Sequence, residues 1–224
     1  MSDIVGEADP RRWETGRVEA FSDGVFAIAI TLLVLDIKLD ASAFDHLRHA
    51  LLDEWPSYLA YVTSFLTVGS VWIAHHNLFT RLKYVDGALL RINMLLLMAA
   101  AFLPFPTSVL AGALNSSNQA ERVAIAFYGA TALLIELLLV AGVRHAASQP
   151  DLFVDPADAE SRLLKRKRER RGWFRTLAYP AAIALGIIAV PKAAAIVYLV
   201  VAAQGVVSLG DDGQFTIRRL RARA

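Results

Sequence analysis

Long apolar stretches separated by short polar connections dominate the hydrophobic pattern of this chain. Six of them approach or exceed the roughly 20 residues that an α-helix needs to cross the hydrocarbon core of a bilayer. The last two are short and are separated only by Pro191 and Lys192, so a re-entrant hairpin is the alternative to two short spans. We expect an all-α membrane protein with six transmembrane helices, at residues 18–37, 56–79, 88–110, 122–143, 174–190 and 193–209.

The composition supports a chain that lies in a membrane. Of the 224 residues, 56% are apolar and 20% are charged, whereas soluble domains are about 45–50% apolar. The mean hydropathy is +0.45. Cysteine is absent, which excludes a disulfide framework, a thiolate metal site and a cysteine nucleophile. Because Asp23 interrupts the start of the first apolar stretch and no small-residue cleavage site follows it, we expect this stretch to remain in the protein.

The positive charges are sorted along the chain, although the formal net charge is only +2. With six spans and a cytoplasmic N-terminus, 19 lysine and arginine residues fall on the cytoplasmic side and 4 fall outside, as the positive-inside rule requires. We therefore expect a multi-pass protein of the inner (plasma) membrane with both termini in the cytoplasm. Its expected parts are an N-terminal segment at 1–17, a six-span domain at 18–210 with a basic cytoplasmic connection at 148–172, and a basic tail at 211–224.

Two connections between the spans carry distinctive charges. The outer loop at 38–55 is acidic, and its periodicity predicts a short surface helix at 45–52; the loop is either simply solvated or a vestibule that concentrates cations. In the basic connection, Asp155 followed by Pro156 is typical of a helix start, and 162–171 reads as a basic helix. This helix is suited to anionic lipid. It lacks the interleaved aromatic residues of a nucleic-acid site, so we expect no nucleic-acid partner.

A few polar residues stand inside or beside the apolar stretches, where a charged group costs roughly 2.5–3.5 kcal/mol on insertion scales. Asp23 lies near the start of the first span, and the second span places Trp72, His75 and His76 at a similar depth. The favoured interpretation is a hydrogen-bond network between helices. A proton relay and a metal site are the alternatives. The residues of the expected network are Ser22, Asp23, Trp72 and one histidine.

Other polar positions and short strings are less specific. Asn93 and Glu136 are suited to bonds between helices, and Glu136 could also accept a proton. The Pro-Phe-Pro-Thr string at 104–107 should kink or end the third span. The string at 67–69 matches the start of the T-V-G-Y-G potassium filter, but the next two residues depart from it, so no carbonyl filter is expected. No G-x-S-x-G or H-E-x-x-H motif occurs, so an enzyme is not expected.

One face of the first span carries a row of aliphatic side chains. At 100° per residue, Ile28, Leu32 and Leu35 fall within about 60° of one another, and Thr31 flanks the row. Asp23 lies about 140° around the helix from Ile28. The carboxylate and the aliphatic row are therefore predicted to face different surroundings.

The start of the first span resembles the signature of the transmembrane protein 175 family, which comprises the endolysosomal potassium channels and their bacterial relatives. The resemblance covers nearly the whole chain by its six-span plan, with less support from motifs after about residue 149. The chain is similar to the prokaryotic members, which have one six-span repeat and assemble as homotetramers. The matching strings are Arg17-x-x-x-Phe21-Ser22-Asp23, Trp72-x-x-His75-His76 and Pro-Phe-Pro-Thr at 104–107.

This resemblance implies a cation channel whose permeating ion is potassium and which needs no cofactor. It implies that the first span lines a central pore, with Ile28 at the constriction and Leu32 and Leu35 in the next layers. Thr31 matches the hydroxyl position associated with potassium preference. The signature residues have structural roles and bond to the tryptophan and histidines of the second span. These signature residues are Arg17, Phe21, Ser22 and Asp23.

The function expected from these observations is a potassium-selective or potassium-preferring channel with a hydrophobic gate. An aliphatic ring offers no polar partner to an ion or to its water, so it closes a pore by dewetting. The alternative is a proton channel or a proton-coupled transporter, although we see no paired broken helices or inverted repeats of the kind that transporters carry. Its titratable residues would be Asp23, His75, His76 and Glu136.

Overall fold

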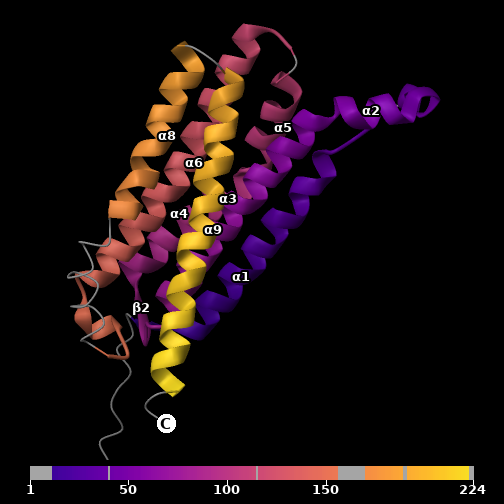
Figure 1. Ribbon diagram of the computed structural model, residues 1–224. Helices are drawn as coiled ribbons and strands as arrows, with labels where there is room; N and C mark the ends of the chain where they lie inside the picture. Colours follow the sequence, from indigo (N-terminus) through magenta and orange to yellow (C-terminus); the bar gives the residue numbers. More distant parts are fainter. Residues whose placement is uncertain (1–11, 40, 115, 156–169, 189–190, 222–224) are drawn as a thin grey trace, which may run out of the picture.

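The computed structural model describes residues 12–39, 41–114, 116–155, 170–188 and 191–221, and most of these residues are helical. Figure 1 shows the long helices running side by side as a bundle, with α8 and α9 on one side and α1 on the other. The α-helices are α1 (Thr15–Leu32), α2 (Leu47–Asp53), α3 (Trp55–Phe79), α4 (Gly87–Phe102), α5 (Pro104–Ala113), α6 (Asn118–Ala147), α8 (Arg170–Ile188) and α9 (Pro191–Arg221). The shorter elements are the strands β1 (Arg12–Glu14) and β2 (Tyr84–Asp86) and the 3-10 helices η1 (Leu33–Asp36), η2 (Ala41–His46) and η3 (Pro150–Leu152).

Four described helical segments are long and apolar enough to cross a membrane. They correspond to the first four predicted spans and are Thr15–Asp36, Trp55–Phe79, Gly87–Ala113 and Asn118–Ala147. Two shorter apolar helices, Leu177–Ile188 and Pro191–Val207, occupy the places of the fifth and sixth. The prediction of a helical, multi-pass chain is confirmed at this level.

The structure differs from the sequence-based boundaries at the C-terminal end. Helix α9 continues to Arg221, well past the predicted end at 209, because hydropathy marks where an apolar run ends and not where a helix ends. The predicted acidic surface helix is divided into η2 and α2. The predicted basic helix at 162–171 lies outside the described residues, except for its last two residues, which begin α8.

The third span is broken where the sequence predicted a break. Helix α4 ends at Phe102, and α5 begins at Pro104 after a single intervening residue. Proline has no backbone N–H to donate, and its ring clashes with the carbonyl four residues earlier, so the first helix cannot continue unchanged. Both halves pack against α6. In addition, α4 packs against α1, whereas α5 packs against α3.

Helix α3 packs against four other helices of the bundle, α1, α5, α6 and α9. Its buried face carries hydroxyl side chains among the apolar ones. The Ser64 hydroxyl lies 2.7 Å from the Thr107 hydroxyl on α5 and 3.1 Å from the Tyr128 hydroxyl on α6. Thr67 and Ser70 instead donate to carbonyls of their own helix. These three hydroxyls are therefore hydrogen-bonded, as a membrane interior requires, whereas the buried Thr63 hydroxyl has no partner among the described residues.

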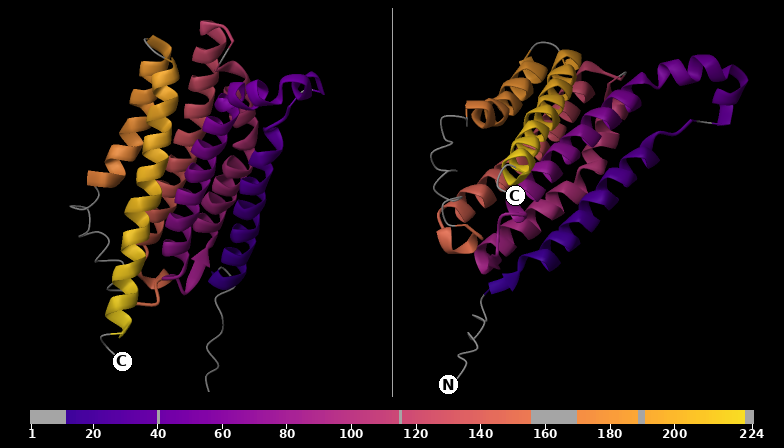
Figure 2. Two further views of the ribbon diagram at one scale, coloured as in Figure 1. Left: turned by 45° about the vertical axis from the view of Figure 1, so that its right-hand side comes forward. Right: turned by 60° about the horizontal axis from the view of Figure 1, so that its bottom comes forward.

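A two-stranded ribbon closes one end of the bundle, and the sequence analysis did not predict it. Strand β1 pairs antiparallel with β2, with Arg12 opposite Asp86. The segment between α3 and α4, which contains β2, also contacts η3 after α6. There the Lys83 amide donates to the Leu152 carbonyl at 2.7 Å. We call this the ribbon end of the bundle. The opposite end is the arm end, where η2 and α2, together called the arm, project away from the other helices (Figure 2).

Glycine at position 129 allows α6 to lie close to α8 and α9. A Cβ atom there would overlap the Tyr198 hydroxyl and lie 2.6 Å from Cγ1 of Ile183. Tyr198 is buried, and its hydroxyl donates to the Ile125 carbonyl at 3.1 Å. Little room remains for the Tyr198 side chain to move.

We expect Gly129→Ala to destabilise the protein by about 1–3 kcal/mol, the usual cost of overpacking a core. The thermal unfolding temperature in detergent measures this loss. Gly112→Ala is the matched control, since no atom lies within 4 Å of its Cβ position. Equal unfolding temperatures for the two variants would show that α6 and α9 are not in close contact.

Candidate functional site

Helix α1 has one buried face and one exposed face. Ser22, Phe26 and Ala29 are buried against the bundle, and Leu33 continues this face into η1. On the opposite side, the predicted pore-facing residues have exposed side chains. The exposed fractions are 61% for Ile28, 41% for Leu32 and 61% for Leu35.

Thr31 is also exposed, beside this aliphatic row. Its hydroxyl donates to the Ile28 carbonyl at 2.9 Å. Because the single hydroxyl proton is used within the helix, the oxygen lone pairs are what Thr31 presents to its surroundings. Leu35 lies in η1 and not in a continuous α-helix as expected, but the tighter turn leaves it on an exposed side.

The buried face of α1 is held by a chain of polar groups from three helices. Nε2 of His75 on α3 lies 2.9 Å from Oδ1 of Asn93 on α4. Asn93 donates through Nδ2 to the Ser22 hydroxyl at 3.0 Å, and Ser22 donates to the Val18 carbonyl at 2.8 Å. All three side chains are at most 3% exposed. This buried chain fixes the ribbon-end half of α1 against α3 and α4.

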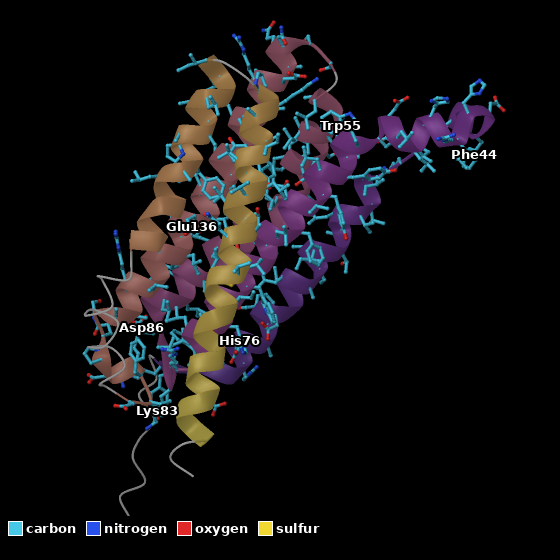
Figure 3. All side chains as sticks on the ribbon, in the orientation of Figure 1. Phe44, Trp55, His76, Lys83, Asp86 and Glu136 are labelled. Carbon is cyan, nitrogen blue, oxygen red and sulfur yellow. The ribbon has the colours of Figure 1, made fainter. Side chains whose placement is uncertain are left out.

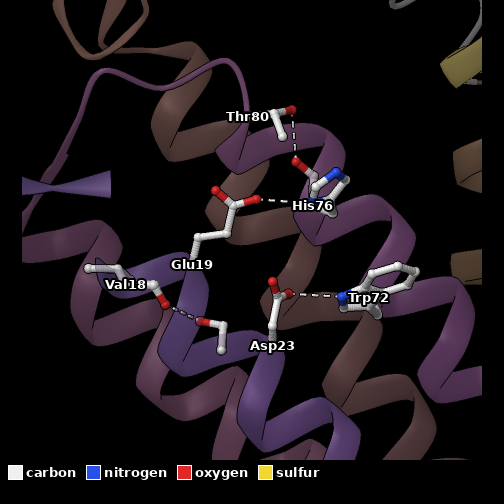
Figure 4. Close-up of polar contacts among 7 residues, drawn as sticks. Val18, Glu19, Asp23, Trp72, His76 and Thr80 are labelled. Carbon is white, nitrogen blue, oxygen red and sulfur yellow. Dashed lines mark hydrogen bonds and ion pairs between the residues drawn. The ribbon is translucent and has the colours of Figure 1, made fainter. Parts of the chain in front are cut away.

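A second set of contacts joins α1 to α3 at the edge of the bundle (Figure 4). The Trp72 indole N–H donates to Oδ1 of Asp23 at 2.9 Å. One turn further along, Nδ1 of His76 lies 2.9 Å from Oε1 of Glu19. The Trp72 and His76 rings stack with centroids 5.8 Å apart. The Trp72–Asp23 and His76–Glu19 pairs thus add directional bonds between α1 and α3, on the more exposed side of the buried polar contacts.

The expected single network is therefore two separate sets, and this corrects the sequence-based picture. Within the part of the chain that the structure describes, neither histidine is hydrogen-bonded to Asp23. His75 and His76 are adjacent in sequence but project about 100° apart on the helix, so they reach different partners. Glu19 was missed because it occupies one of the variable positions of the signature. The side chains of Arg17 and Phe21 are exposed.

The remaining candidates for proton or metal chemistry lie apart. Glu136 is buried on α6 at 5% exposure and has an interaction partner, and Figure 3 places it nearer the middle of the bundle than His76. Among the described residues, no group of three or more histidine, aspartate or glutamate side chains is arranged to hold a metal ion. The His75–Asn93 and His76–Glu19 pairs also direct the two imidazoles to different helices.

A further polar junction at the ribbon end gave no sequence signal. Oδ1 of Asp86 accepts from the Leu89 amide at 2.7 Å and so caps α4, while Oδ2 lies 2.8 Å from Nε2 of His145 at the end of α6. Partial burial alone would raise the pKa of Asp86. The hydrogen bonds from Leu89 and His145 outweigh that effect and lower the pKa below its ordinary value of 3.8. The carboxylate thereby joins three elements while ionised.

We expect the stability of the protein to fall at acid pH partly through Asp86. A carboxyl group with a lowered pKa stabilises the fold above its unfolded pKa, and this contribution is lost as the pH falls below about 3.8 through the folded value. Asp86→Asn, which keeps an acceptor for Leu89, should flatten the unfolding-temperature profile below that pH. Asp53→Asn on the exposed arm is the control, since it removes one carboxylate elsewhere. If the profile of Asp86→Asn follows that of the wild type, Asp86 does not contribute to the loss of stability at acid pH.

Comparison with known proteins decides the family. The family model described as endosomal/lysosomal potassium channel TMEM175 matches residues 17–104, which hold most of α1, all of α3 and α4, and the polar contacts described for α1. A protein named as a potassium channel in Streptomyces collinus is 42% identical over 197 residues, covering 88% of this chain and 90% of the relative. The chain belongs to the TMEM175 family. The resemblance noted from the sequence is confirmed, and the family is one of ion channels and not of enzymes.

Other TMEM175 relatives extend this result to the fold. A potassium channel of Chamaesiphon minutus is 44% identical over 152 residues, 66% of this chain and 74% of the relative. The crystal structure of a lysosomal potassium-selective channel TMEM175 homolog from that organism matches with a TM-score of 0.75 and 37% identity, covering 87% of this chain and 97% of that one. The human endosomal/lysosomal proton channel TMEM175 is 40% identical over 119 residues, but the match spans only 24% of its length.

Proposed function

We propose that this chain is one subunit of a homotetrameric, potassium-selective channel whose pore is lined by α1. The observation that carries this proposal is the row of exposed aliphatic side chains on α1, opposite a face that is bonded to α3 and α4. Around a symmetry axis, four such rows form a continuous aliphatic lining. The bacterial relatives named as potassium channels support potassium as the permeating ion.

Six spans with both termini in the cytoplasm are the topology that this proposal uses. The sorting of 19 positive residues to one side supports it, as does the packing of α8 against α9, which lie two residues apart in the sequence. The ribbon end is then cytoplasmic and the arm end external, in a bacterial inner membrane. The proposed parts remain 1–17, 18–210 and 211–224, and the basic connection at 148–172 is the proposed contact with anionic lipid.

The gate is the ring of Ile28, with Leu32 and Leu35 beyond it. Aliphatic walls give water no hydrogen bond, so a narrow ring dewets and stops ions. The polar anchors of α1 extend only as far as Asp23, whereas the residues after Gly24 are held by apolar packing of Phe26, Ala29 and Leu33. Apolar contacts are non-directional, so this half of α1 can tilt or rotate and widen the ring while the anchored half stays fixed.

Selectivity in this proposal involves Thr31. Its oxygen turns lone pairs outward because its proton is donated to the Ile28 carbonyl. Four such oxygens beside the gate favour a cation that has lost part of its hydration shell. Four hydroxyl groups supply a weaker field than stacked rings of backbone carbonyls, so we expect a potassium preference and not strict exclusion of other monovalent cations.

The alternative of a proton pathway has less support from the contacts around α1. In the series of hydrogen bonds from His75 to Ser22, the Asn93 amide lies between the imidazole and the hydroxyl, the two groups that could exchange a proton. The series ends at the backbone carbonyl of Val18. Nδ1 of His75 is buried and has no hydrogen-bond partner among the described residues. The geometry is that of an interhelical anchor.

Reversal potentials of the purified protein in planar bilayers test the proposed function. With potassium and pH gradients imposed separately, we expect the reversal potential to follow the potassium gradient and to stay near zero under the pH gradient alone. His75→Gln should leave this selectivity unchanged. A reversal potential that follows the pH gradient, or one that His75→Gln shifts, would instead support proton conduction.

A further inference from the structure

One face of α4 is exposed from its first turn to its last. Near the ribbon end this face carries Arg91, whose side chain is exposed. The positions that follow on the same side of the helix are apolar and are between 47% and 65% exposed. They are Met94, Leu95, Met98 and Phe102. We call these five residues the α4 face, which is one cation followed by an apolar stripe.

The length of the α4 face matches half of a bilayer. At a rise of about 1.5 Å per residue, Arg91 and Phe102 lie about 16 Å apart along the helix, and each half of a hydrocarbon core of about 30 Å measures about 15 Å. The rings of Phe105 and Phe127 contact the Phe102 ring, with centroids 5.6 and 6.2 Å away, and close the deep end of the stripe. With Arg91 at the level of the lipid headgroups, the stripe reaches the middle of the bilayer.

Arg91 and Trp13 meet over the first turn of α4. A Cβ atom on Gly87 would lie 3.8 Å from Nη1 of Arg91 and 3.7 Å from Cζ3 of Trp13, so the guanidinium and the indole approach the same point. Trp13 is 43% exposed, although Val85, its partner across the ribbon, is buried. An exposed tryptophan beside a basic side chain is typical of the interface between membrane and water.

No carboxylate of the described residues forms an ion pair with Arg91. Alternate side chains of a strand point to opposite faces, so Glu14 and Asp86 lie on the face of the ribbon turned away from Trp13. Asp86 is also engaged elsewhere, since its Oδ2 lies 2.8 Å from Nε2 of His145. The positive charge of Arg91 is therefore available to an anion from outside the chain.

We propose that the α4 face binds one anionic phospholipid, with the phosphate on Arg91 and Trp13 and an acyl chain along Met94, Leu95 and Met98. A guanidinium can donate two parallel N–H bonds to a phosphate, and the indole N–H is a further donor. A second copy of this chain, inserted the same way, would present its own ribbon end at this depth. Because lysine and arginine predominate at that end, it is a poorer partner for Arg91 than a phosphate.

Quenching by nitroxide-labelled lipids tests the proposal, because the chain has no native cysteine to compete for a label. Met98→Cys carries a bimane, and the protein is placed in phosphatidylcholine vesicles in which a nitroxide acyl chain is borne by either phosphatidylglycerol or phosphatidylcholine. We expect phosphatidylglycerol to quench at an about tenfold lower mole fraction, as charge-assisted hydrogen bonds to Arg91 imply. Leu177→Cys on α8, which is 61% exposed, is the matched control and should show no preference. Equal quenching by both lipids at 98 would overturn the proposal. Protection from both would mean that a second copy covers the α4 face, and this would also overturn it.

Substitution of the cation gives a second measurement in the same vesicles. Arg91→Gln should abolish the preference for phosphatidylglycerol at 98, since glutamine carries no charge. Lys83→Gln removes a positive charge from the same end of the bundle (Figure 3), where Nζ of Lys83 lies 5.1 Å from the centroid of the Tyr84 ring, and it should keep the preference. A preference that survives Arg91→Gln, or that Lys83→Gln removes as fully, would refute a site at Arg91. Neither measurement requires ion flux, so failure of the lipid site is distinguishable from failure of the proposed channel function.

Discussion

Replacing Ile28 with asparagine is expected to increase potassium flux through the reconstituted protein by about tenfold. Ile28 is 61% exposed on the face of α1 that carries no bonds to the rest of the bundle. An amide at this position gives water in the pore a hydrogen-bond partner, worth about 0.5–1.5 kcal/mol net for each bond. A lowering of the barrier by about 1.4 kcal/mol is a tenfold change in rate. Liposome flux assays with a potassium gradient measure the change.

Met98→Asn is the matched control for this experiment. Met98 is an equally exposed apolar residue, at 65%, but it lies on α4 and not on α1. We expect its flux to equal that of the wild type. A similar increase in both variants would mean that the amide acts by disturbing the membrane-facing surface, and unchanged flux in Ile28→Asn would remove Ile28 from the gate.

The second large effect is expected from Asn93→Leu. Leucine cannot accept from Nε2 of His75 or donate to the Ser22 hydroxyl, and all three positions are at most 3% exposed. A buried polar group left without its partner costs about 1–3 kcal/mol, and His75 already has one nitrogen without a partner among the described residues. The loss is a large fraction of a typical stability of about 5–15 kcal/mol. The yield of folded protein and its unfolding temperature in detergent measure it.

The double variant His75→Leu with Asn93→Leu separates a broken hydrogen bond from poor packing. Replacing both partners with apolar side chains is often nearly neutral, so we expect the double variant to recover part of the stability that Asn93→Leu loses. If His75→Leu lowers the stability of the Asn93→Leu variant by as much as it lowers that of the wild type, then His75 and Asn93 are not coupled.

The helical plan could be predicted from the sequence because apolar length is a direct physical requirement of the bilayer. A different rule, the local chemistry of proline, located the break at Pro104. Apolar length could not locate the end of α9, and it did not predict the ribbon. Pairing of β1 with β2 depends on three residues in each strand that are about 70 positions apart, and so short a segment has no readable periodicity.

The contacts around α1 were predictable in part. Helical spacing placed Asp23 and Trp72 at one depth, and their side chains are hydrogen-bonded. It could not show that His75 bonds to Asn93, because the rotation of one helix about its axis relative to another is set by tertiary packing and not by spacing within either helix. Asp86 and His145 were missed for the same reason. Each lies at a helix end, and only the folded chain brings those two ends within 2.8 Å.

The bonds that anchor α1 also impose an order on how the protein is made. Asp23 finds its partner 49 residues later in the chain, and Ser22 finds Asn93 71 residues later. At about 5–20 residues per second, the ribosome needs several seconds to supply those partners after α1 has emerged. During this interval the polar side of α1 has neither of its final partners. The polar side of α1 therefore reaches its final contacts only after α3 and α4 have been translated, although α1 is synthesised before both of them.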